Sequence, residues 1–139
     1  MSGETRGYTF DVSEGFFRLT TECLRLRSNE TLRYQSLASL LEGLVPTGAP
    51  RLVALDGDVV RDHLVTIATR GSVRLFIRMS RESADLLVEA KRALASRLNI
   101  RLTVADAMSV LLLDYIIAQK ADNVMRRIGR LDVPPAPAN

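Results

Sequence analysis

The chain is poor in the side chains that carry catalysis and metal binding. Its 139 residues include one cysteine, one histidine and no tryptophan. Cys23 alone cannot form an intrachain disulfide, and with His63 it would still need carboxylates, at no recognisable spacing, to complete a zinc site. The glycines do not cluster into a phosphate-binding loop. We therefore expect no catalytic residue, no metal and no cofactor.

Long hydrophobic segments are also missing. The longest apolar run, residues 110–113, stops at Asp114 and is too short to span a bilayer. The first ten residues, MSGETRGYTF, lack the charged segment and apolar run of a signal peptide. The sequence therefore predicts a soluble, cytoplasmic protein without a membrane partner.

Positive charge is unevenly distributed. The formal net charge is +3, but residues 1–45 hold five Lys/Arg and six Asp/Glu. Residues 73–139 hold eleven Lys/Arg and seven Asp/Glu. A basic surplus in the second half fits contact with a polyanion, although a surplus of this size is also common on solvated surfaces.

Two short segments alternate between apolar and other residues, as strands do. In residues 73–79 one face is apolar and the other carries two arginines around an aromatic ring. A lone strand is unstable in water, so this strand needs a partner, and residues 8–12 show the same alternation. The faces expected to point away from the core consist of Gly7, Thr9 and Asp11 in the first strand and Arg74, Phe76 and Arg78 in the second.

Each predicted strand is followed by a serine that can cap a helix. Ser13 predicts a helix over 14–27, and Ser80 predicts one that ends near Asn99. The stripe of the first of these helices contains Cys23, which we interpret as a small core residue.

A second helix follows in each half, after a polar break. The first covers 32–45, after a break at 28–31, and ends before Pro46. The second covers 105–121 and is apolar nearly all round, which predicts a central helix. Within it, Asp114 needs a partner if it is buried.

The segments outside these elements are harder to interpret. In the connector, residues 46–72, we expect a short strand over 52–55, a turn at Asp56-Gly57 and one or two helical turns over 58–66. Residues 120–130 are basic and continue the last helix, and the proline-rich tail is disordered or extended.

The order strand, serine cap, helix, break, apolar helix occurs twice. Ser13 aligns with Ser80, and the segment LASLLEGL (37–44) parallels MSVLLLDY (108–115). We therefore predict a mainly α fold with a two-stranded antiparallel β-ribbon, built as two related halves in one compact domain. Its parts are 8–45, the connector 46–72, 73–121, and a basic extension with a proline-rich tail over 122–139.

This layout resembles the ribbon-helix-helix proteins, the Arc/MetJ type of DNA-binding fold. The segment VRLFIRMSRESADLLVEAKRAL, which starts at Val73, is typical of the family, and the likeness covers about 8–45 and 73–120. It departs from the family in the break at 99–103, which has no glycine. The chain resembles a single-chain tandem version, as found in conjugative-plasmid and T-DNA transfer proteins.

The resemblance implies which residues meet DNA. Outward-facing residues of the ribbon contact bases, and backbone N–H groups at the starts of the second helices bind phosphate. The implied base contacts are Gly7, Thr9, Asp11, Arg74, Phe76 and Arg78. The implied phosphate contacts are Thr103, Val104, Ala105, Asn29 and Thr31.

Each of these residues also has a simpler interpretation. The arginines of the strand can form an exposed charged face, and the helix starts can be ordinary caps. For Asp11 we favour an ion pair with a ribbon arginine over acceptance of a hydrogen bond from cytosine. For Arg126, Arg127 and Arg130 we favour a solvated face.

The resemblance implies sequence-specific binding of double-stranded DNA in the major groove. The implied role is a transcriptional regulator, such as a repressor, or an accessory factor of plasmid transfer or maintenance. Self-association on DNA and a protein partner stay open. The alternative function is a protein-interaction module, antiactivator-like or antitoxin-like, that keeps the fold without binding DNA.

Overall fold

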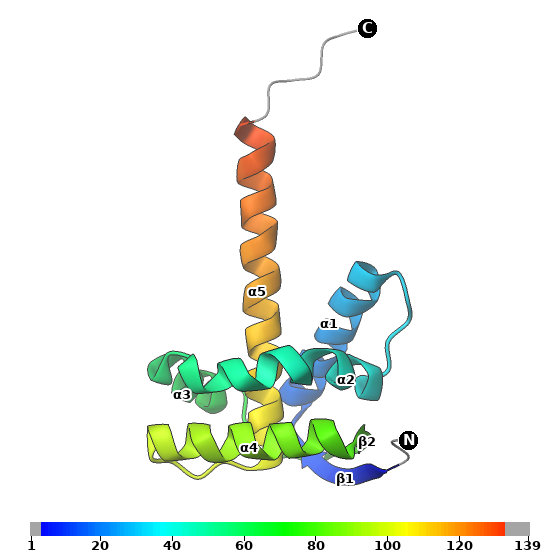
Figure 1. Cartoon of the computed structure of the whole chain (residues 1–139), viewed down its shortest axis with the longest axis vertical. Coiled ribbons are helices and arrows are strands. Elements are labelled where there is room, and N and C mark those ends of the chain that lie inside the picture. The colour runs from blue at the N-terminus through cyan, green and yellow to red at the C-terminus, as the bar shows by residue number, and fades with distance from the viewer. Residues whose placement is uncertain (1–3, 133–139) are drawn as a thin grey trace, which may run out of the picture.

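The computed structural model describes residues 4–132, which form a mainly helical fold with one two-stranded sheet. In Figure 1 the last helix stands upright, and its C-terminal half extends away from the other elements. The elements in chain order are β1 (Thr5–Val12), α1 (Glu14–Thr31), α2 (Leu37–Gly48), the 3₁₀ helix η1 (Ala49–Ala54), α3 (Gly57–Thr66), β2 (Val73–Ser80), α4 (Arg81–Leu98) and α5 (Val104–Asp132).

The predicted pairing of the two strands is confirmed. β1 and β2 form an antiparallel ribbon in which Gly7 lies opposite Arg78 and Asp11 opposite Arg74. β1 begins at Thr5, earlier than the sequence predicts, because Thr5 and its neighbours pair with the end of β2. The predicted alternation of buried and exposed side chains is also confirmed in β2, since Ile77 is 2% exposed while Arg74 and Arg78 are exposed.

Serine caps begin the helices that follow the strands, as predicted. The Ser13 side chain accepts a hydrogen bond from the backbone N–H of Phe16, and Ser80 accepts one from Ser83. The start of α4 has a further contact, because the Glu42 carboxylate of α2 accepts hydrogen bonds from Ser80 N–H, Ser80 Oγ and Ser83 Oγ. α2 is thereby held to the junction of β2 and α4.

The predicted boundaries between α1 and α2 are wrong. α1 continues through the expected break at 28–31 and ends at Thr31, because the next residue, Leu32, has a left-handed φ of 56°. α2 starts later, with Ser36 as its cap in a capping box with Ser39. Pro46 lies inside α2 instead of ending it, and the buried residues around it continue to Gly48.

The connector was also predicted incorrectly in part. Residues 52–55 do not form a strand, because η1 occupies Ala49–Ala54 and packs Leu52 fully into the core. The expected turn at Asp56-Gly57 is a helix start, since Asp56 Oδ1 accepts hydrogen bonds from the N–H groups of Asp58 and Val59. α3 is ten residues long, longer than the one or two turns expected.

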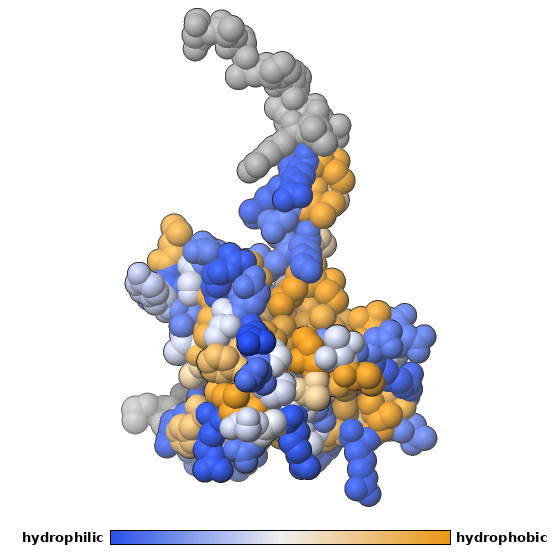
Figure 2. Space-filling model, turned by 180° about the vertical axis from the view of Figure 1, so that it is seen from behind, coloured by the Kyte–Doolittle hydropathy of each residue, from blue (hydrophilic) through white to orange (hydrophobic). Residues whose placement is uncertain are grey.

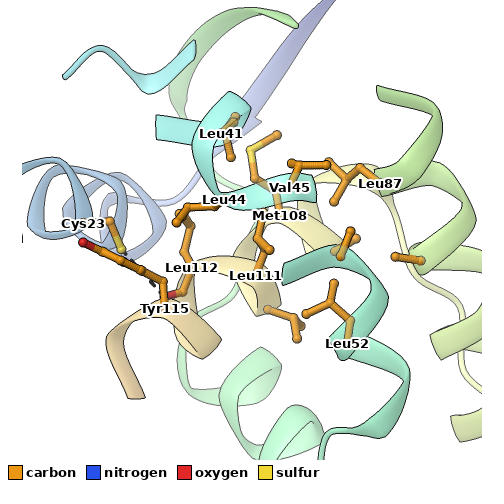
Figure 3. Close-up of a cluster of buried hydrophobic side chains, with 14 of the residues drawn as sticks. Cys23, Leu41, Leu44, Val45, Leu52, Leu87, Met108, Leu111, Leu112 and Tyr115 are labelled. Carbon is orange, nitrogen blue, oxygen red and sulfur yellow. Dashed lines mark hydrogen bonds between the residues drawn. The ribbon is translucent and has the colours of Figure 1, made fainter. Parts of the chain in front are cut away.

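Helix α5 is central over its first half, as its apolar sequence predicts. Figure 3 shows Met108, Leu111 and Leu112 between side chains of α2, η1 and α4. Cys23 contacts the same cluster and is fully buried, and burial raises the pKa of its thiol to about 12. Its interpretation as a core residue is therefore confirmed.

Asp114 is buried and has the partner that its position requires. Its two carboxylate oxygens accept hydrogen bonds from Arg51 Nη2 at 2.9 and 2.8 Å. Arg51 belongs to η1, so this ion pair fastens the connector to the central helix. The extension predicted over 120–130 is continuous with α5, which runs to Asp132. The predicted proline-rich tail after Asp132 lies outside the described residues.

Within residues 4–132, the helices are too short or too polar for a membrane crossing.

Candidate nucleic-acid interface

The outward face of the ribbon gathers the six residues expected to contact bases. They come from facing positions of the two strands, because Gly7, Thr9 and Asp11 lie opposite Arg78, Phe76 and Arg74. All six are exposed. A ribbon with one side buried in the core therefore presents a polar and aromatic surface on its other side.

Phe76 is the apolar centre of this face. Its ring is 64% exposed, which is unusual for a large aromatic side chain. It lies across Gly7, where a Cβ atom would stand 3.3 Å from the ring, so glycine leaves room for it. The Arg78 guanidinium lies 5.8 Å from the ring centroid, within the range of a cation–π contact.

The two arginines of this face differ in their partners. Arg74 Nε donates to Asp11 Oδ1 at 3.1 Å, which confirms the interpretation of Asp11 as an ion-pair partner. Arg78 Nη1 donates to the neutral Thr5 Oγ1 at 3.0 Å. Arg74 is therefore paired with a carboxylate, whereas the partner of Arg78 is a neutral hydroxyl.

The start of α5 lies beside this ribbon. Thr103 and Asp106 form a capping box, in which Thr103 N–H donates to Asp106 Oδ2 and Asp106 N–H donates to Thr103 Oγ1. The N–H groups of Val104 and Ala105 have no protein acceptor among residues 4–132. A hollow of about 230 Å³ adjoins this helix start and is bounded on its other side by residues 9–11 of β1.

The corresponding prediction for the first half is wrong. Asn29 and Thr31 lie in the last two turns of α1, and Thr31 Oγ1 donates to the carbonyl of Arg27. A helix end presents carbonyl groups and partial negative charge, so it does not favour phosphate. The helix start in this half is at Ser36, five residues beyond Thr31.

Two arginines near the α5 start were not singled out from the sequence. Arg70 lines the same hollow as Thr103, and exposed Arg101 stands two residues before Thr103. Neither has an ion-pair partner within the part of the chain that the structure describes. Arg70 therefore adds positive charge to the hollow at the helix start, and Arg101 adds positive charge to the segment before it.

Backbone contacts with the ribbon fix the position of Arg70. It forms a bridge with Val12, and Gly71 N–H donates to the Asp11 carbonyl at 3.1 Å. A Cβ on Gly71 would lie 2.4 Å from Ser13 Cα, so only glycine allows this approach. In the sequence, Gly71 just before the second strand could have indicated a close backbone contact at this point.

The remaining titratable groups have structural surroundings. His63 is buried, its Nε2 lies 2.8 Å from Ser109 Oγ, and burial lowers its pKa from 6.5. Between residues 4 and 132, three or more His, Cys, Asp or Glu side chains do not gather into a metal site. Arg126 and Arg127 are exposed on the projecting part of α5, away from the ribbon face.

The site therefore consists of a polar ribbon face next to an anion-attracting helix start. This arrangement can bind an extended polyanion by hydrogen bonds and charge. No protein-family model, curated protein or solved structure matches this chain.

Proposed function

We propose that this chain binds double-stranded DNA by inserting the β1–β2 ribbon into the major groove, as a single-chain tandem ribbon-helix-helix protein. The observation that carries the proposal is the outward face of the ribbon, with two arginines, a threonine and an exposed phenylalanine on paired strands. The major groove is about 12 Å wide and admits a two-stranded ribbon.

The order of elements supports the tandem interpretation. A strand, a serine-capped helix and a further helix occur in β1–α1–α2 and again in β2–α4–α5. The strands pair with each other, so one chain supplies both halves of the ribbon. η1 and α3 belong to the connector between the halves.

Base recognition would be concentrated on Arg78. A guanidinium can donate two hydrogen bonds to O6 and N7 of guanine, worth about 1–3 kcal/mol of discrimination. To contact a base, Arg78 would break only a hydrogen bond to the neutral Thr5 hydroxyl, whereas Arg74 would break its ion pair with the Asp11 carboxylate. Thr9 and Phe76 are suited to the thymine methyl group.

Phosphate would bind at the start of α5. Free N–H groups at a helix start attract anions, and Arg70, which lines the adjoining hollow, adds positive charge there. Arg101 adds an exposed positive charge in the segment just before the helix. The Asp106 carboxylate is engaged by Thr103 N–H and Thr69 Oγ1, which reduces its opposition to an incoming phosphate. This contact would set the register of the ribbon in the groove.

The biological role in this proposal rests on the family resemblance. It is a transcriptional regulator, such as a repressor, or an accessory DNA-binding factor of plasmid transfer or maintenance.

The test begins with selection of bound sequences from random duplexes, followed by affinity measurements across a salt series. We expect affinity to fall steeply with salt, because phosphate neutralisation releases counterions. Arg78→Ala should cost about 1–3 kcal/mol on the selected site and much less on random DNA. The matched control is Arg126→Ala, which removes the same charge from the far part of α5. Equal losses in the two variants would contradict base reading by the ribbon.

A second candidate is a protein-interaction module without DNA binding. The Asp11–Arg74 pair favours it, because it neutralises one of the two arginines on the outward face of the ribbon. Leu32 and Tyr34 also favour it, since they are 89% and 103% exposed in the loop between α1 and α2. This candidate predicts no salt-dependent affinity for any duplex.

A further inference from the structure

The projecting half of α5 carries an uncovered apolar stripe. Figure 2 shows an orange band along this helix that continues onto the body of the protein. The large apolar residues of this region are strongly exposed: Ile117 is 47%, Val124 53%, Met125 65% and Ile128 46% exposed. Soluble proteins seldom leave a continuous apolar stripe in water, so this stripe is a candidate contact surface.

The spacing of the stripe is that of a helix-to-helix seam. Ile117, Ala121, Val124 and Ile128 are separated by four, three and four residues. This alternation of four and three keeps apolar residues facing a second helix of the same period. Outside the seam, the exposed residues include the polar Asp122, Asn123 and Arg126 and the apolar Met125.

The stripe lies on the C-terminal part of α5, beyond the half of the helix that is buried in the core. The stretch from Ile117 to Ile128 is about three turns, or about 17 Å, long. Val124 and Ile128 are 53% and 46% exposed, so the described part of the chain covers these side chains only in part. A second helix along the stripe would remove this apolar surface from water.

We propose that the partner is a second copy of this chain, and that the two α5 helices pack in parallel along the seam. In a parallel pair identical residues meet in layers, so Val124 meets Val124 and Ile128 meets Ile128. Ala121 meets Ala121, where the small side chains let the two backbones approach. All four layers are then apolar, and neither copy must bury a charge.

The charges beside the seam select the parallel direction. Lys120 and Arg127 occupy the same flank, one heptad apart. In an antiparallel pair Lys120 would stand opposite Arg127 of the second copy, and like charges would repel. In the parallel pair Lys120 lies beside Met125 of the second copy, where its aliphatic stem can cover apolar surface.

The length of the seam sets the strength of the association. Four layers bury less than the roughly 1,000 Å² that a stable interface commonly needs. The dimer is therefore weak and concentration-dependent. Two copies bound side by side on another molecule would have a raised effective concentration, so the weak contact between their α5 helices would form more readily.

A disulfide trap tests the contact in the full-length protein. Val124→Cys places a thiol in the seam, and Asn123→Cys, the matched control, places one on the neighbouring position outside it. Oxidised glutathione is the oxidant, and Cys23 does not interfere because it is fully buried. We expect Val124→Cys to form covalent dimers at least about tenfold faster than the control.

Sedimentation velocity of the unoxidised chain is the second measurement. The average mass of the wild type should rise with concentration, and Ile128→Asp should stay monomeric with unchanged circular dichroism. Equal cross-linking in the two cysteine variants, or a wild-type mass that stays monomeric, would refute the second copy as partner. Faster cross-linking of mixed Ala121→Cys and Val124→Cys chains than of Val124→Cys alone would refute the parallel direction.

Discussion

The Asp11–Arg74 pair allows the proposed DNA contact to be strengthened by a single substitution. Asp11→Asn removes one negative charge from the ribbon face and keeps the shape of the side chain. The remaining amide oxygen can still accept a hydrogen bond from Arg74 Nε, now 3.1 Å from Oδ1. Both side chains are largely exposed, at 74% for Arg74 and 55% for Asp11, so folding should lose less than about 1 kcal/mol.

Two effects determine the expected gain in affinity. Arg74 no longer has to give up an exposed ion pair, which is worth about 0.2–1 kcal/mol. A phosphate about 6 Å away also loses the repulsion of the carboxylate, about 0.7 kcal/mol in water. Together these amount to about 0.9–1.7 kcal/mol, or roughly five- to twentyfold tighter binding.

The assay is a fluorescence anisotropy titration on a random-sequence duplex across a salt series. Random sequence removes any new base contact by the introduced asparagine. The matched control is Glu89→Gln, which removes an exposed carboxylate paired with Arg92 on α4 at 4.0 Å. We expect tighter binding and a steeper salt dependence for Asp11→Asn, by about one released counterion, and little change for the control.

Weaker binding of Asp11→Asn to random DNA would refute this reasoning. Weaker binding only to the selected site would instead show that Asp11 reads a base, with the carboxylate accepting from cytosine N4. Equal increases in DNA affinity for Asp11→Asn and Glu89→Gln would mean that only the net charge of the protein matters, and that the ribbon face is not the DNA contact.

Two further predictions concern stability. Burial raises the pKa of Glu42, but hydrogen bonds from Ser80 and Ser83 lower it more, so the pKa is held below 4.5. Glu42→Gln should lower the free energy of unfolding, measured in urea at neutral pH, by about 2 kcal/mol. The difference between wild type and variant should shrink as the pH falls below 4.5, because the protonated wild-type carboxyl no longer contributes this stability. A difference that does not change with pH would contradict the prediction. Gly71→Ala should lower the free energy of unfolding by about 1–3 kcal/mol, because the added Cβ would clash with the Ser13 backbone. The control Gly129→Ala should be neutral or stabilising, because the added Cβ would have no atom within 4 Å. Equal effects of the two substitutions would contradict the close approach of Gly71 to Ser13.

Local patterns predicted the ribbon, its faces and the helix caps. Alternation in 8–12 and 73–79 placed Thr9, Asp11, Arg74 and Arg78 on the outward face, where the structure has them. These features depend on residues one to four positions apart, so the sequence contains them directly.

Boundaries were less predictable where two local signals compete. Ser28 to Thr31 have polar side chains that suit a break, yet α1 continues to Thr31. Ser28 instead accepts a hydrogen bond from Gln35 N–H and so supports the loop after the helix. The helix start expected near Asn29 and Thr31 is absent for this reason, because a shift of about one helical turn changes a helix start into a helix end.

The sequence by itself determined the periodicity of each element, the central place of α5 and the two faces of the ribbon, because these follow from the spacing of neighbouring side chains. Only the tertiary structure decided the partners. Arg51 reaches Asp114 across 63 residues, and Arg70 comes to lie in the hollow beside Thr103 because Gly71 packs against Ser13. Such pairs depend on how packed elements meet in space, and no local spacing encodes that meeting.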